Sequence, residues 1–166
     1  PVMGVAYIDK GMIVATDAQH LIKIDLSFFG IEKDDADKLE QKCIDTDTIK
    51  KLGALKATQR WFINEQGINI YKNNSDKVGL IYPLDEIDEV GNYPNYDAVI
   101  PQDEVELSSF GMSPQLMLNV EKVYSNYKLS ESSNLKISLH GKNRPITMKS
   151  ECRKFLGLVM PVNIDF

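Results

Sequence analysis

The chain has 166 residues, of which 43% are hydrophobic and 26% charged, and its net charge is −5. This length suits one medium domain or two small ones with a sizeable core. The composition is that of an ordinary globular protein, and the acidic balance argues against a protein that coats nucleic acid through overall positive charge.

Three segments each predict a β-hairpin, because two β-rich runs flank a turn that contains glycine. The turns hold Gly11, Gly67 and Gly141, and the segments span residues 5–16, 61–71 and 135–148. Alternation with a period of two is clearest between Leu135 and Leu139. The recurrence of this unit predicts a repeat architecture with divergent copies.

Two helices are predicted, each just before a hairpin. Ser113 and Pro114 form an N-cap followed by proline at the first helical position, and apolar residues recur at helical spacing from Leu116 to Tyr127. A shorter helix, capped within residues 45–47, turns Leu52 and its apolar neighbours inward. Both helices packed on one face of two antiparallel sheets give an α+β fold.

Residues 28–41 and 130–134 are polar, and we expect solvated loops there, the first with a helical turn. Neither loop is long enough to link domains, so we expect one unit over residues 1–166. No apolar run approaches the roughly 18 residues of a membrane span, and no signal peptide is visible, which predicts a cytoplasmic protein.

The sequence offers little for catalysis or for a metal. Cys43 and Cys152 have no metal-ligand spacing and are expected to be free thiols, with a disulfide or a reactive thiol as the alternative. Asp17 and His20 allow an acid–base alternative, but Asp17 is expected to cap a turn. The acidic runs at 34–37 and 85–89 lack the pattern of a calcium loop. We therefore expect no enzyme, no cofactor and no metal.

Four stretches, in this order, carry a resemblance to a known family: Pro-Val-Met-Gly-Val at 1–5, Ala-Thr-Asp-Ala-Gln-His-Leu at 15–21, Tyr-Pro-Asn-Tyr with Val-Ile-Pro at 93–101, and the helix at 113–127 followed by a C-terminal Val-Met-Pro-Val. They resemble the bacterial replicative sliding clamp, the beta subunit of DNA polymerase III. Residues 1–101 resemble most of the clamp's middle domain, and residues 102–166 resemble the last half of its C-terminal domain.

The departures from the family pattern indicate a shortened clamp-like member. The family has three domains, whereas here the first helix of the middle domain and the first half of the final domain are missing. Ala18 stands where the family has glycine, and Asn163 stands where the family has a terminal arginine.

The resemblance implies a groove that binds short linear peptides of polymerases and of other replication or repair proteins. A rim of Leu, Met, Val and Pro can take the Leu and Phe anchors of an extended peptide. Carried over by position, its walls are Thr16, Ala18, Gln19, His20, Leu21, Pro101, Leu158, Val159, Met160, Pro161 and Val162.

The second role that the resemblance implies is contact with DNA phosphates through a helix surface, without reading of the bases. An ordinary solvated helix face is the alternative, and encirclement needs several copies closing a ring. The resemblance therefore predicts a processivity or recruitment factor in DNA replication, with a monomeric adaptor or decoy that binds peptides without encircling DNA as the alternative. The candidate DNA-binding residues are Lys50, Lys51, Lys56, Arg60, Lys122 and Lys128.

Overall fold

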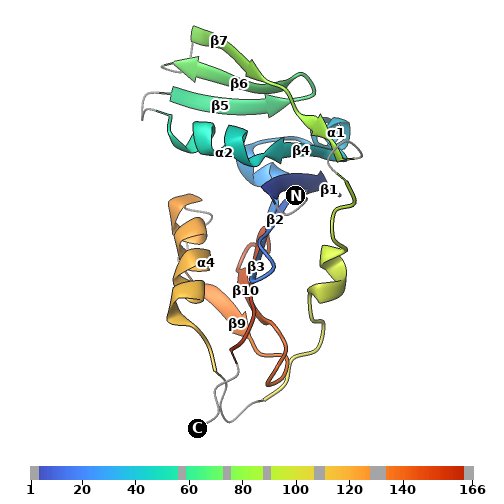
Figure 1. Ribbon diagram of the computed structural model, residues 1–166, viewed down its shortest axis with the longest axis vertical. Coiled ribbons are helices and arrows are strands. Elements are labelled where there is room, and N and C mark those ends of the chain that lie inside the picture. Colours follow the sequence, from blue (N-terminus) through green and yellow to red (C-terminus); the bar gives the residue numbers. More distant parts are fainter. Residues whose placement is uncertain are drawn as a thin grey trace.

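A computed structural model describes residues 4–55, 59–72, 76–87, 91–106, 111–127 and 134–162. Strands dominate these ranges, and two helices longer than six residues accompany them (Figure 1). The strands are β1 (Val5–Asp9), β2 (Met12–Thr16), β3 (His20–Asp25), β4 (Lys42–Asp45), β5 (Gln59–Asn64), β6 (Gly67–Lys72), β7 (Asp76–Tyr82), β8 (Asp85–Glu86), β9 (Leu135–Ser138), β10 (Ile146–Ser150) and β11 (Phe155–Val159). The helices are α1 (Lys33–Lys38), α2 (Thr46–Gly53) and α4 (Pro114–Tyr127), with 3-10 turns η2 (Leu26–Phe29) and η3 (Tyr96–Val99).

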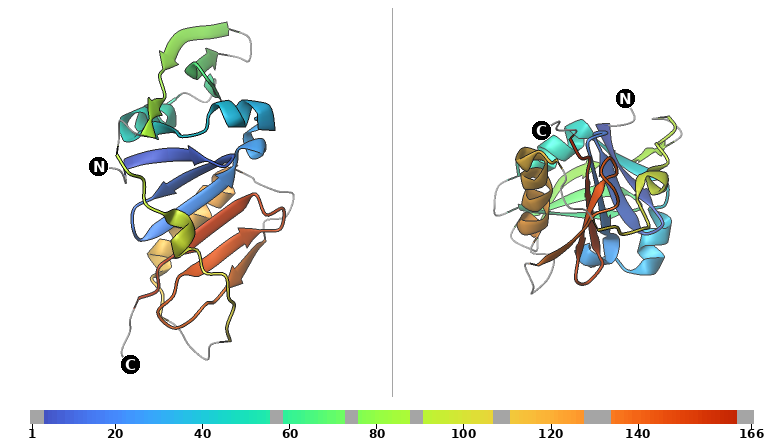
Figure 2. Two further views of the ribbon diagram at one scale, coloured as in Figure 1. Left: turned by 90° about the vertical axis from the view of Figure 1, so that its right-hand side faces the viewer. Right: turned by 90° about the horizontal axis from the view of Figure 1, so that it is seen from below.

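Eight strands form one antiparallel sheet in the order β8-β4-β1-β2-β3-β11-β10-β9 (Figure 2). The three predicted hairpins are confirmed as β1–β2, β5–β6 and β9–β10. The join between the N-terminal and C-terminal strands is the pairing of β3 with β11, in which Leu21 lies opposite Leu158. Segments almost 140 residues apart in the sequence thus become neighbours in one sheet.

Helix α4 covers one face of this sheet. Its apolar stripe places Val120 and Tyr124 in a buried cluster with Ile24 of β3 and Phe155 of β11. Gly157 lies directly under the helix, because a Cβ at that position would stand 2.3 Å from Val120 Cγ1. The predicted start of this helix is confirmed at Pro114.

Helix α2 packs where the large sheet meets the three-stranded sheet β5-β6-β7. The Asp45 side chain accepts hydrogen bonds from Asp47 N at 2.8 Å and Thr48 N at 3.0 Å, which confirms the predicted cap. Leu52 then joins a buried cluster with Ala6 and Ile44. Both helices lie on the same side of the large sheet, as predicted (Figure 1).

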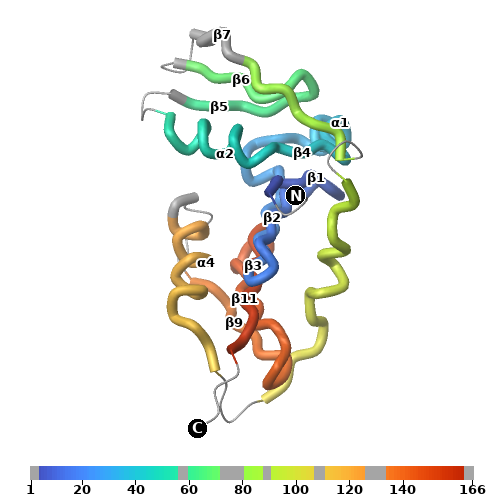
Figure 3. Tube along the Cα trace, viewed as in Figure 1, coloured from blue at the N-terminus to red at the C-terminus, as the bar shows by residue number. Residues whose placement is uncertain are grey.

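An extended segment, residues 91–106, crosses the opposite face of the large sheet, and we call it the strap (Figures 1 and 3). Tyr96 is buried in a cluster with Val14, Leu21 and Leu158. Tyr93 and Ile100 are partly buried and pack against the same cluster. The large sheet is therefore covered by helices on one face and by the strap on the other. The sequence indicated a family motif here but not a structural layer.

The polar stretch at 28–41 contains the end of η2 and all of α1, so it holds more helix than the single turn we expected. Ala36 and Leu39 are buried against Ile8, which explains why this charged segment is ordered against the sheet. Cys43 is buried and Cys152 is exposed, and the two cysteines form no disulfide, as predicted. The polar loop at 130–134 lies outside the described residues except for Asn134.

Candidate functional site

The turn between β2 and β3 is held by its own side chains. Thr16 Oγ1 donates a hydrogen bond to the His20 carbonyl at 2.7 Å and accepts one from Ala18 N at 3.2 Å. Ala18 has a φ of 72°, in the left-handed region that favours glycine. This is the position where the clamp pattern has glycine, so the backbone geometry explains that preference.

Asp17 caps the same turn. Its carboxylate accepts hydrogen bonds from Gln19 N at 3.0 Å and His20 N at 2.7 Å, and it lies 2.8 Å from His20 Nδ1. Partial burial acts to raise the pKa of Asp17, but the hydrogen bonds from His20 and the backbone outweigh it, so the pKa lies below its ordinary value. The carboxylate therefore caps the turn, as predicted, and at the same time contacts the His20 ring.

The pairing of β3 with β11 brings the C-terminal motif beside this turn. Val159 lies opposite His20 in the sheet, and Met160 N donates a hydrogen bond to the Gln19 carbonyl at 3.1 Å. Beyond it, Val162 N donates to the Gly111 carbonyl at 3.2 Å. The groove residues at 16–21 and those at 158–162 thus lie side by side.

The residues assigned to the groove divide by burial into those that a ligand can reach and those that support the surface. Met160 is 37% exposed and Val162 36% exposed, whereas Val159 is fully buried. Leu21 and Leu158 are buried beneath the strap, so a surface-bound peptide does not reach their side chains in this conformation. Ala18 and Gln19 are exposed, Thr16, His20 and Pro161 are partly buried, and Leu21, Pro101, Leu158 and Val159 are buried.

A shallow hollow of about 550 Å³ lies where the strap meets the C-terminal motif. Pro101 and Met160 line it, together with Val99, Arg144 and Pro145. The last three were not assigned from the sequence. Val99 is 50% exposed and belongs to the Val-Ile-Pro stretch, so its motif could have identified it, whereas the Arg144–Pro145 turn carries no pattern of its own.

Polar contacts of Glu104 attach the second half of the strap to the sheet, since Lys136 Nζ and Ser138 Oγ of β9 each donate to its carboxylate at 2.8 Å. Three side chains attach the first half. Burial raises the pKa of Tyr93 to about 12, and its hydroxyl donates to the Val14 carbonyl at 3.2 Å. The Tyr96 hydroxyl donates to the Asp9 carboxylate.

Asp97 completes this attachment through two cations. Lys10 Nζ and Lys23 Nζ each lie 3.0 Å from a different oxygen of its carboxylate. The hydrogen bond from Lys10 and the contacts of Lys23 hold the pKa of Asp97 below its ordinary value, despite partial burial. These contacts fix one wall of the hollow relative to Met160.

The assigned basic residues fall into three groups. Lys50 and Lys51 of α2 and Lys122 of α4 are exposed on helices that share one side of the large sheet (Figure 1). Lys50 pairs with Asp47 at 3.4 Å, and Lys51 Nζ lies 5.6 Å from the centre of the Tyr82 ring. Arg60 is also exposed but belongs to β5 and lines a different hollow. Lys56 and Lys128 lie outside the described residues.

Comparison with solved structures identifies the architecture. The chain matches a DNA polymerase sliding clamp from Bacillus subtilis with a TM-score of 0.57 and 14% sequence identity, over 99% of this chain and 58% of that chain. It also matches the DNA polymerase III subunit beta from Borrelia burgdorferi, solved in complex with a natural product, with a TM-score of 0.56 and 12% sequence identity. This match covers 99% of this chain and 57% of that chain. The chain has the fold of a bacterial sliding clamp.

The match covers less than three fifths of each clamp chain, so this sequence corresponds to part of the clamp architecture. No protein-family model matches the sequence, and no curated protein matches it significantly. Among the described residues, no helix is long and apolar enough to cross a membrane. Within the same residues, no group of three or more His, Cys, Asp or Glu side chains is arranged to hold a metal ion.

Proposed function

We propose that this chain is a clamp-like accessory protein of DNA replication that recruits partners by binding their short linear peptides. The observation that carries the proposal is the hydrogen-bonded contact between Gln19 and Met160, next to the hollow lined by Pro101. The sheet pairing of β3 with β11 creates this surface from segments far apart in the sequence. The clamp fold supports a role in replication. The role is binding rather than catalysis.

The chemistry of the surface suits an extended peptide with apolar anchors. Met160 and Val99 present exposed apolar side chains, and a flexible thioether adapts to different ligands. Fully burying one Leu or Phe anchor contributes roughly 1.5–3 kcal/mol. Gln19 and Arg144 supply polar groups at the margin of the apolar area. Such a shallow site predicts modest affinity, as is useful for partners that must exchange.

The domain assignment belongs to the same proposal. Residues 1–101 correspond to most of a clamp middle domain and residues 102–166 to the last half of a final domain, joined by β3 and β11 in a single sheet. The exposed lysines of α2 and α4 make a DNA-facing surface the natural second element of this function. The alternative is an adaptor that binds peptides without contacting DNA.

The test is the substitution Met160→Asp. A charge in the apolar hollow should weaken binding of a fluorescent peptide with Leu and Phe anchors at least tenfold, measured by fluorescence anisotropy. Met160 is partly exposed, so the fold should persist, whereas Leu21→Asp would place a charge in the core.

The matched control is Leu118→Asp. Leu118 is 49% exposed on α4, so this variant introduces the same charge at an exposed apolar residue outside the hollow. It should bind the peptide as the unmodified chain does. Equal affinity of all three proteins, or an equal loss in both variants, would disprove the docking site.

A further inference from the structure

Among the described residues, the small sheet has no counterpart of the strand β4 of the large sheet. In the large sheet, the meander β1-β2-β3 is extended by β4, which pairs antiparallel with β1. In the small sheet, the meander β5-β6-β7 has no strand beside β5 among the described residues. The first strand of the second meander is therefore an open edge at the position that β4 occupies in the first.

The open edge of β5 presents backbone groups in a defined register. The two-residue turn Glu65–Gln66 makes Asn64 and Gly67 a hydrogen-bonded pair, and hydrogen-bonded pairs recur at every second residue of an antiparallel ladder. The backbone N–H and C=O groups of Trp61 and Ile63 consequently point away from β6. They are available to an additional strand.

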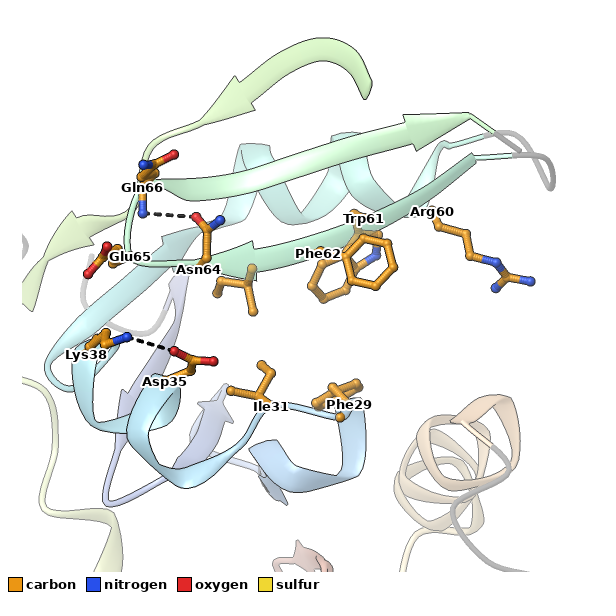
Figure 4. A pocket seen from close by; sticks show the side chains of 12 residues that line it. Phe29, Ile31, Asp35, Lys38, Arg60, Trp61, Phe62, Asn64, Glu65 and Gln66 are labelled. Atoms are coloured by element: carbon orange, nitrogen blue, oxygen red, sulfur yellow. Dashed lines mark hydrogen bonds and ion pairs between the residues drawn. The ribbon is translucent and has the colours of Figure 1, made fainter. Parts of the chain in front are cut away.

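A groove follows this edge. It has a volume of about 740 Å³ and is lined on one side by the consecutive residues 60–66 and on the other by residues of η2 and α1 (Figure 4). Its middle is apolar: Phe29 and Ile31 face Trp61 (Figure 4), Ile63 packs against the same buried cluster as Ile31, and Phe62 is 55% exposed. An edge strand with three consecutive large apolar residues is unusual, because such edges favour pairing with another chain.

The dimensions of the groove fit one extended chain. Six residues of strand are roughly 20 Å long, which gives the groove a mean cross-section on the order of 40 Å². Neighbouring strands lie about 4.8 Å apart and packed layers about 10 Å apart, so one strand occupies a cross-section of the same order and the groove suits a single extended chain. Phe29 and Ile31 form part of the wall opposite β5.

The two ends of the groove carry opposite charge. Arg60 is exposed at one end, and Glu65 lies at the other beside Asp35 and Lys38, which pair with each other at 2.9 Å (Figure 4). The charges of Lys38 and Asp35 cancel, so the charge of Glu65 makes this end of the groove negative. An occupant that is acidic near Arg60 and basic near Glu65 complements both ends.

We propose that β5 binds an extended peptide of a partner protein by strand addition, antiparallel to β5, with a basic N-terminal end and an acidic C-terminal end. Apolar side chains of the peptide lie opposite Trp61 and Ile63. This groove is separate from the hollow at Met160, so the proposal stands independently of the proposed function.

The test uses the fluorescently labelled peptide Lys-Thr-Val-Thr-Val-Glu, acetylated and amidated at its ends, and fluorescence anisotropy with the whole chain. The peptide of reversed sequence has the same composition and should bind at least tenfold more weakly. The variant Arg60→Glu should weaken binding at least tenfold. The double variant Arg60→Glu, Glu65→Lys reverses the charge at both ends of the groove. It should therefore recover affinity for a peptide in which the terminal Lys and Glu have been exchanged. Met160→Asp should leave the affinity unchanged.

N-methylation of the peptide separates strand addition from nonspecific apolar contact. In the proposed register the two Val residues direct their N–H groups at β5, whereas the two Thr residues direct theirs away. N-methylation of both Val residues should abolish binding, and N-methylation of both Thr residues should preserve it. Equal effects of the two modifications, no binding of the parent peptide, or a concentration-dependent dimer that Arg60→Glu dissociates would overturn the proposal.

Discussion

Ala18 combines a left-handed backbone conformation with a side chain that disfavours it. The residue follows Asp17 in the turn that leads to Gln19, and the hydrogen bond from Ala18 N to Thr16 Oγ1 fixes its backbone. Glycine adopts this conformation without a steric penalty, although it loses more entropy on folding. The present turn is therefore mildly strained next to the proposed docking surface.

Ala18→Gly should stabilise the chain by up to about 1 kcal/mol, because relief of the left-handed strain exceeds the added entropy cost. In a thermal melt this raises the midpoint by about 2–4 °C for a chain of this size. An unchanged or lower midpoint would show that the turn carries no such strain. Lys10, at a φ of 52° in another turn, provides the parallel substitution Lys10→Gly.

At the scale of elements, the contact between α4 and β11 depends on the absence of a side chain at Gly157. A methyl group there would collide with Val120, a stiff β-branched residue that is 1% exposed. Gly157→Ala should therefore destabilise the fold by roughly 1–3 kcal/mol. Gly53→Ala in α2 is the control, since no atom lies within 4 Å of its added Cβ and alanine favours helix by up to about 1 kcal/mol.

Urea unfolding measures both changes, and the two variants should shift the midpoint in opposite directions. A Gly157→Ala chain as stable as the unmodified one would mean that α4 sits further from β11 than the structure shows. Because β11 also pairs with β3, loosening this contact should disturb the turn at Gln19 as well.

The elements themselves were largely predictable, because hairpins, the Asp45 cap and the Ser113–Pro114 helix start are local signals. The strap was not, since residues 91–106 have neither helical nor strand periodicity and are held by tertiary contacts such as Asp97 with Lys10. Nor does any local pattern announce that β3 pairs with β11. Leu21 and Val159 are buried because of that pairing, whereas Met160 is partly exposed. The resemblance could not separate these two classes of residue, so it assigned all of them to the walls of one groove.

For the whole molecule, we propose that one chain joins a docking surface at Met160 to a DNA-facing helix side that carries Lys50, Lys51 and Lys122. Three phosphate contacts predict that the affinity for duplex DNA falls with salt with a log–log slope of roughly −3 at most. In this proposal the chain connects a partner's peptide to DNA. The monomeric adaptor, by contrast, binds the peptide alone.

The most direct test of this claim is to measure how much of a fluorescent peptide with Leu and Phe anchors is retained on immobilised duplex DNA, with and without the chain, over a salt series. We expect retention that requires the chain, falls with salt, and is lost in either Met160→Asp or Lys122→Glu. Lys142→Glu, an equal charge change at an exposed position in the β9–β10 turn, should have no effect. A chain that binds the peptide but leaves none on DNA at any salt concentration would contradict the claim.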